Sequence, residues 1–127
     1  MENKIKSLIK EMNQCWLNSE FDSLKKYYHP ETVLFRGADN EAIIGCDAII
    51  ESYREFGSMG KIHLFDIISI DIYHFGELFI AHMGFEVDYE IPSGRFREEG
   101  IEVYALIPVK DTYQIVWRNQ VSKTPSK

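Results

Sequence analysis

Glu102 is the acidic residue whose sequence context most favours a chemical role. It lies within residues 101–107, a run rich in β-branched and aromatic residues, and it has apolar neighbours on both sides. If its side chain points into an apolar interior, loss of hydration raises its pKa and makes it a candidate acid, base or ligand anchor. The alternative is a glutamate that faces solvent or a subunit interface and pairs with a nearby arginine.

Other patterns of polar residues give weaker indications of chemistry. Glu86, Asp88 and Glu90 alternate along a second strand-like run, but alternate acids usually mark the solvent-exposed side of a sheet. The four histidines are too dispersed for a metal-binding signature, so we expect no metal site. The sequence has no glycine-rich phosphate loop, Ser-His-Asp set or Cys-His pair, and we expect no cofactor.

The spacing of apolar residues predicts the elements that must position Glu102. Helices are predicted at residues 3–18, 22–28 and 45–57. Strands are predicted at residues 32–36, 62–73, 78–89, 101–107 and 113–117. A polar turn is expected at 38–41, before the third helix. Helices followed by strands that are joined through hairpins indicate an α+β domain, with the helices on one face of the sheet.

Length and composition limit the class of protein. The 127 residues fit one domain, placed at 1–127 with a polar tail at 122–127, and a 45% hydrophobic content is typical of globular proteins. The net charge of -6 argues against nucleic acid and anionic membranes as partners. No apolar run approaches the roughly 20 residues of a membrane span, and no signal peptide is recognisable, so we expect a cytoplasmic protein. Cys15 and Cys46 are expected to be reduced and buried.

The strand at 101–107 has apolar residues on both of its faces. Residues 101, 103, 105 and 107 form one face, and Tyr104 and Leu106 belong to the other. The helices can cover only one face of the sheet, so the second face needs another cover. We therefore expect a homodimer that forms through the sheet.

Five short motifs carry a resemblance to a known superfamily. They are WLN at 16–18, YHPETV at 28–33, GCDAI at 45–49, EG at 99–100 and WRNQ at 117–120. In this order they resemble the nuclear transport factor 2-like superfamily, in particular its SnoaL-like and ketosteroid isomerase-like members. The resemblance implies a cone-like (cystatin-like) fold, in which a strongly bent antiparallel sheet wraps around a long N-terminal helix and two shorter helices. Members include isomerases, cyclases, dehydratases, binding modules and association domains, so the fold alone constrains function weakly.

The sequence departs from the steroid isomerases at the positions that carry their chemistry. Those enzymes use a tyrosine on the first helix, an aspartate base at the end of the first strand and a protonated aspartate on a later strand. The matching positions here are Asn13, Phe35 and Glu102. Because an aromatic ring stands at the position of the base, we do not expect steroid-isomerase chemistry.

The resemblance also implies which residues would line a pocket between the sheet and the helices. They are Trp16, Phe35, Tyr53, Glu102, Trp117 and Asn119. Ligand pockets are mostly apolar walls with a few polar groups that fix orientation, although ordinary core packing would use the same residues. Arg97 and Arg118 could pair with an acidic ligand, but surface ion pairs are the simpler interpretation.

Three hypotheses for function follow. The leading one is a binding domain for a small, largely hydrophobic organic molecule. The second is an enzyme of the isomerase, cyclase or dehydratase type that uses Glu102 for proton transfer. The third is a structural dimerisation domain whose interior is filled by its own side chains.

Overall fold

Three helices and six strands make up the part of the chain that the structure, a computed structural model, describes: residues 2–36 and 41–122. The helices are α1 (Glu2–Leu17), the 3-10 helix η1 (Phe21–Tyr27) and α2 (Cys46–Met59). The strands are β1 (Tyr28–Arg36), β2 (Glu41–Ile44), β3 (Lys61–Phe75), β4 (Leu78–Ile91), β5 (Gly94–Val109) and β6 (Thr112–Ser122). Most of the expected turn at 38–41 and of the expected tail at 122–127 lies outside the described residues.

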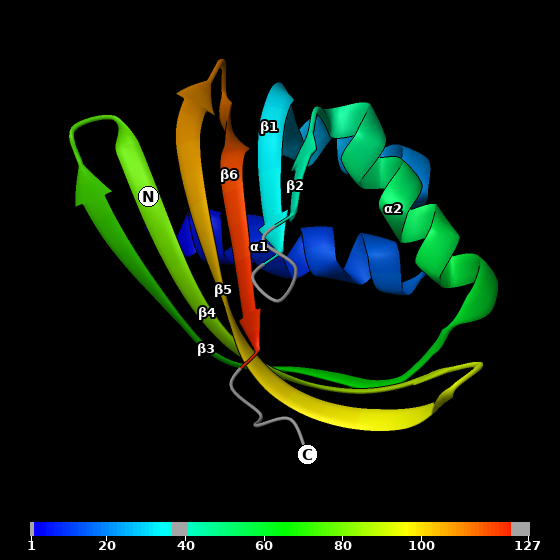
Figure 1. The fold of residues 1–127 in the computed structure, drawn as a ribbon. Coiled ribbons are helices and arrows are strands. Elements are labelled where there is room, and N and C mark those ends of the chain that lie inside the picture. Colours follow the sequence, from blue (N-terminus) through cyan, green and yellow to red (C-terminus); the bar gives the residue numbers. More distant parts are fainter. Residues whose placement is uncertain (1, 37–40, 123–127) are drawn as a thin grey trace.

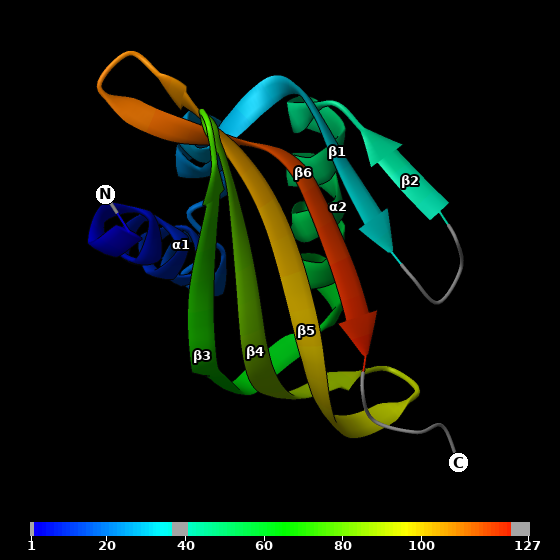
Figure 2. The ribbon, with the colours of Figure 1, turned by 90° about the vertical axis from the view of Figure 1, so that its left-hand side faces the viewer.

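The strands form one curved sheet in the order β2-β1-β6-β5-β4-β3. Neighbouring strands are antiparallel except β1 and β6, which are parallel. Figure 1 shows how β3, β4 and β5 bend so that their lower ends sweep beneath α2. In Figure 2, α1 and α2 lie behind the sheet, and no described helix lies in front of it. This arrangement confirms the predicted cone-like α+β fold.

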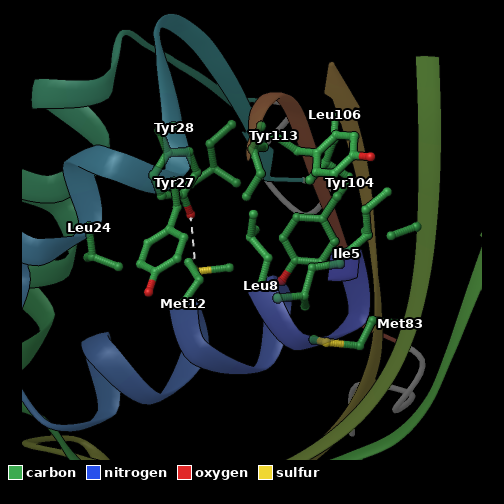
Figure 3. Packing of buried hydrophobic residues seen from close by; sticks show 14 of the residues in the cluster. Ile5, Leu8, Met12, Leu24, Tyr27, Tyr28, Met83, Tyr104, Leu106 and Tyr113 are labelled. Carbon is green, nitrogen blue, oxygen red and sulfur yellow. Dashed lines mark hydrogen bonds between the residues drawn. The ribbon is translucent and has the colours of Figure 1, made fainter. Parts of the chain in front are cut away.

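The side of the sheet that faces the helices holds the core, and the predicted periodicities account for it. The helical stripe of α1 is buried at Ile5, Leu8, Ile9 and Met12, as its spacing predicted. In β4 the alternate residues Phe79, Ala81, Met83, Phe85 and Val87 are buried. Figure 3 shows residues from α1, β1, β4, β5 and β6 packed into this core. Among the described residues, no helix is long and apolar enough to cross a membrane.

Some elements differ from the predictions. The short strand β2, Glu41–Ile44, was not predicted, and it exists because it pairs with the end of β1 at the sheet's edge. The helix predicted at 22–28 is the 3-10 helix η1, Phe21–Tyr27. Strand β5 begins at Gly94 rather than at residue 101, because its charged first half pairs with β4 from Ile91 onward. Pairing with a neighbouring strand therefore outweighs local propensity in this hairpin.

A bulge in β6 decides which side chains point inward. Ala105 pairs with Trp117 and Leu106 pairs with Ile115, which leaves Val116 as an extra residue. A single extra residue reverses the alternation of side chains along the rest of a strand. Ile115 before the bulge is therefore fully buried, Trp117 after it is 42% exposed, and Arg118 is buried.

Candidate functional site

Two neighbouring strands bring a carboxylate and a guanidinium together on the inner face of the sheet. Glu102 of β5 lies opposite Gln120 of β6, and Tyr104 of β5 lies opposite Arg118 of β6. Residues two apart on a strand share a face, so the four side chains form one cluster. Glu102 is 1% exposed and Arg118 is 3% exposed, and they are the two buried charged residues among those that the structure describes.

The carboxylate of Glu102 is fully hydrogen bonded. Arg118 Nη2 donates to both of its oxygens, at 2.7 Å each. Gln120 Nε2 donates to Oε2 at 2.7 Å, and the Tyr104 hydroxyl donates to Oε1. Each oxygen thus accepts two hydrogen bonds, which fills the capacity of an ionised carboxylate.

The guanidinium of Arg118 is satisfied except at one atom. Its Nη1 donates to the Tyr28 hydroxyl at 2.7 Å and to the Tyr53 hydroxyl. Its Nε is buried and has no hydrogen-bond partner among the described residues. A guanidinium has five N–H donors, so Arg118 keeps one of them available for an acceptor.

Burial dominates the electrostatics of the cluster. Loss of hydration raises the pKa of Glu102 to about 7, and hydrogen bonds from Tyr104 and Gln120 only partly oppose this rise. Burial also raises the pKa of Tyr28, against the influence of the nearby Arg118 charge. The pKa of Tyr104 is raised by burial and by the negative charge of Glu102. The tyrosine hydroxyls therefore stay protonated and can donate or accept hydrogen bonds near neutral pH.

Aromatic rings from three elements adjoin the cluster. Trp16 of α1 stacks on Tyr53 of α2 with 5.5 Å between ring centroids, and it meets Phe65 of β3 edge-on at the same distance. The Trp16 indole N–H donates to Asn13 Oδ1 at 2.8 Å, and Asn13 is itself buried. Trp16 thus offers an apolar ring face beside the charged pair, with its polar end already satisfied.

The structure divides the six expected pocket residues into two groups. Trp16, Tyr53 and Glu102 lie together on the inner side of the sheet, linked through Arg118. Phe35 and Trp117 instead stack on each other on the outer face, with 6.1 Å between ring centroids. Asn119 shares that outer face, since it lies two residues beyond Trp117. The structure therefore does not bring Phe35, Trp117 and Asn119 to the buried cluster, and the bulge in β6 explains the difference for Trp117 and Asn119.

Sequence reasoning missed three members of the cluster, Tyr28, Tyr104 and Gln120, and it preferred a surface position for the fourth, Arg118. Tyr104 could have been predicted, because its position two residues after Glu102 places both side chains on one face of the strand. For Arg118, a surface ion pair was the preferred interpretation, and the structure corrects it to a buried pair with Glu102. A bulge cannot be predicted from a local sequence pattern. The sequence therefore contains no indication that the Arg118 side chain points inward.

A hollow lies beside the cluster, between the end of η1 and the starts of α2 and β6. Its volume is about 200 Å³, and it is lined by Lys25, Tyr28, Pro30, Cys46, Asp47 and Gln114. None of the six expected pocket residues lines it. Tyr28 connects the two regions, because it borders the hollow while its hydroxyl accepts a hydrogen bond from Arg118.

The alternating acids of β4 are engaged in ion pairs. Glu86 pairs with Arg97 at 3.0 Å and Asp88 pairs with Arg95 at 2.9 Å, both across the β4–β5 hairpin. Glu90 lies 3.0 Å from His63 of β3. Across residues 2–36 and 41–122, no group of histidines, cysteines and acids is arranged to hold a metal ion.

Comparison with known proteins identifies the class of fold. An NTF2-like protein from Cytophaga hutchinsonii superposes with a TM-score of 0.83, covering 96% of this chain and 98% of that one at 10% identity. A ketosteroid isomerase-like protein from Erwinia carotovora atroseptica gives 0.80, covering 97% and 96% at 12% identity. A CaMKII hub from S. rosetta gives 0.80, covering 94% and 95% at 11% identity. The chain thus has the NTF2-like fold that its sequence motifs implied.

Sequence comparison adds nothing to this assignment. No family model matches the chain, and no curated protein matches it in sequence. At identities this low, the likeness establishes the fold alone.

Proposed function

We propose that this chain is a small-molecule-binding domain that holds an organic ligand on the inner side of the curved sheet, beside Trp16 and Arg118. The observation that carries the proposal is the Arg118–Glu102 pair, whose side chains are 3% and 2% exposed. A buried ion pair seldom stabilises a fold more than apolar residues of similar size would. Its presence next to an aromatic wall therefore fits a role in recognition better than a role in stability.

Each member of the cluster has a distinct part in this proposal. Glu102 fixes the orientation of Arg118 through two hydrogen bonds, while Tyr104 and Gln120 fix Glu102. Arg118 offers the polar contact to the ligand, and Trp16 offers the apolar contact. A few fixed polar groups beside aromatic walls are the usual composition of a ligand site.

Proton transfer by Glu102 has less support from the same geometry. Both oxygens of its carboxylate already accept two hydrogen bonds, so a substrate proton would first have to displace Tyr104, Gln120 or Arg118. A general base needs direct hydrogen-bond access to the proton that it removes. The cluster therefore favours binding over isomerase, cyclase or dehydratase chemistry.

The test compares ligand binding by two double variants. Native mass spectrometry of the purified chain and ligand-observed NMR with a fragment library would identify molecules that bind near Trp16. The variant Arg118→Met/Glu102→Leu removes the buried pair, and Arg97→Met/Glu86→Leu removes a surface pair as the matched control. We expect the first to weaken binding by about tenfold or more and the second to leave it unchanged. Equal binding by both variants, or no ligand for the unmodified chain, would contradict the proposal.

We also propose that the outer face of the sheet pairs with a second copy of the chain. Phe35 and Trp117 stack on this face, where Trp117 is 42% exposed and Val121 is 44% exposed. The Oδ1 atom of Asn119 is buried there without a hydrogen-bond partner among the described residues, so a partner subunit could supply the donor. One protein of this fold is described as a hub, which is consistent with assembly.

A further inference from the structure

Tyr53 differs from the other hydrogen-bond partners of Arg118. Glu102 is 1% exposed and Tyr28 is 1% exposed, whereas Tyr53 lies only partly buried on α2. Its hydroxyl accepts a hydrogen bond from Arg118 Nη1, and its ring stacks on Trp16 with an interplanar angle of 25°. The Arg118 guanidinium also lies 5.6 Å from the centre of the Tyr53 ring. The Tyr53 side chain thus fits between an indole face and a cation.

The surroundings of Tyr53 are more rigid than Tyr53 itself. The Tyr28 hydroxyl is held by Arg118 and contacts Met12 Sδ at 3.7 Å, a contact drawn in Figure 3. Glu102 is fixed by hydrogen bonds from three side chains. A rotation of the Tyr53 side chain about its Cα–Cβ bond would uncover Arg118 Nη1 and one face of Trp16. It would break the 3.5 Å hydrogen bond between the Tyr53 and Tyr28 hydroxyls, but it would leave the hydrogen bonds of Glu102 and the Tyr28–Arg118 contact in place.

We infer that Tyr53 is an internal stand-in for the ligand, and that the site takes a small phenol whose ring replaces the Tyr53 ring on Trp16 and whose oxygen replaces the Tyr53 oxygen at Arg118. This inference rests on the proposed function, because it names the ligand class of that same site. A phenol whose oxygen takes the place of the Tyr53 oxygen restores the stacking on Trp16 and the hydrogen bonds with Arg118 and the Tyr28 hydroxyl, so exchange between the two rings loses little.

The geometry separates a phenol from molecules that supply only one of the two contacts. An arene without oxygen would leave Arg118 Nη1 short of an acceptor in the interior, which is unfavourable for a buried donor. A saturated alcohol would supply the oxygen, but it has no flat π face to stack on Trp16. Three probes of similar size therefore test the inference: 4-methylphenol, toluene and 4-methylcyclohexanol.

The experiment uses the indole N–H resonance of Trp16 as the reporter. The chain has two tryptophans, so Trp117→Phe leaves Trp16 as the only indole and keeps an aromatic ring against Phe35. Titration in this background should show 4-methylphenol binding about tenfold more tightly than either other probe. Similar affinities for all three probes, or no shift with 4-methylphenol, would overturn the inference.

A pair of tyrosine variants tests the displacement itself. Tyr53→Phe removes the hydroxyl that competes for Arg118 and keeps the ring. We therefore expect 4-methylphenol to bind this variant roughly tenfold more tightly than it binds the chain with Tyr53 intact. Tyr73→Phe makes the same change at an exposed position of β3 and should leave the affinity unchanged. An unchanged affinity in Tyr53→Phe would show that the phenol does not take the place of Tyr53.

Failure of the phenol inference can be distinguished from failure of the proposed small-molecule site. If other molecules bind beside Trp16 in a manner that depends on Arg118, but 4-methylphenol does not bind, then the small-molecule site stands and the phenol assignment fails. If neither 4-methylphenol nor any fragment binds, both fail. The comparison of the three probes in the unmodified site decides the matter even if a Tyr53 variant does not fold.

Discussion

Glu102 and Arg118 form an ion pair in the protein interior, where either charge without its partner would be strongly destabilising. The pair is joined by two hydrogen bonds of 2.7 Å, and each side chain has further hydroxyl or amide partners. Removing one partner leaves an uncompensated buried charge. Replacing both with apolar residues leaves no buried charge, so the loss of stability is limited to changes in packing. The two residues should therefore behave as one unit under mutation.

A mutant cycle tests this unit. We expect Arg118→Met to lower the free energy of unfolding by about 3–5 kcal/mol, and Arg118→Met/Glu102→Leu to recover most of that loss. The surface pair gives the control: Arg97→Met should cost less than about 1 kcal/mol, because Arg97 is 59% exposed. Urea denaturation measures all three variants. Equal losses in the single and double core variants would show that the charges are not coupled.

The raised pKa of Glu102 predicts a pH dependence of stability. Its ordinary value of 4.5 applies to the unfolded chain and its folded value is about 7, so between these pH values the folded state binds more protons. The stability that this group contributes is therefore fully present below pH 4.5 and is lost as pH rises through about 7. Chemical denaturation as a function of pH measures this trend.

Two variants isolate the contribution of Glu102. Glu102→Gln cannot ionise, so its stability should lack this fall between pH 4.5 and about 7. Glu31→Gln changes an exposed glutamate of β1 in the same way and should keep the pH profile of the unmodified chain. A fall of the same size in the Glu102→Gln variant would assign the pH dependence to another group.

At the scale of elements, the close packing of β4, β5 and β6 limits which residues fit. Gly100 of β5 pairs with Phe85 of β4 and with Ser122 of β6. A Cβ atom at Gly100 would lie 2.6 Å from the Phe85 ring and 2.9 Å from the backbone oxygen of Val121. The absence of a side chain therefore lets Phe85 cross the strand there, two residues before Glu102.

We predict that Gly100→Ala destabilises the fold by about 1–3 kcal/mol, because the backbone oxygen of Val121 cannot move aside alone. Gly84→Ala in β4 is the matched control, since its new Cβ would meet only the Ser69 hydroxyl oxygen, at 3.0 Å, and that side chain can rotate. Thermal unfolding of both variants gives the comparison. If Gly84→Ala is the more damaging change, the close contacts at Gly100 do not limit packing.

At the scale of the whole molecule, the sheet has one face covered by helices and one face without a described cover, as Figure 2 shows. The uncovered face carries the Phe35–Trp117 stack and Ile44, which is 71% exposed. Exposed apolar groups gathered on one face are typical of a subunit interface. Under the two proposals, the inner face holds the ligand and the outer face contacts the second copy.

The dimer proposal predicts that lysine at two outer positions gives a monomer. Ile44→Lys/Trp117→Lys places two positive charges in the proposed interface, where they lose hydration and repel their symmetry mates. Met59→Lys, at a 58% exposed position at the end of α2, is the control and should stay dimeric. Sedimentation velocity measures the masses. A monomeric unmodified chain, or a dimeric lysine variant, would contradict the proposal.

The elements with strong periodicity could be predicted from the amino-acid sequence, because burial on one face imposes a regular spacing of apolar residues. The stripe of α1 and the alternation of β4 follow from this rule. The cone-like fold was implied by the resemblance of the short motifs to a known superfamily. Glu102 was also recognisable as a candidate, since it is an acid with apolar neighbours on a strand whose two faces are both apolar.

The residues that share a site with Glu102 depend on how the strands and helices pack together. Whether Trp117 or Arg118 points inward depends on one extra residue, Val116, which the pairing of β5 with β6 places in a bulge. A bulge arises from pairing between strands, so the local spacing of apolar residues does not predict it. The same applies to Tyr53 and Trp16, whose stacking depends on how α2 and α1 pack across the curved sheet.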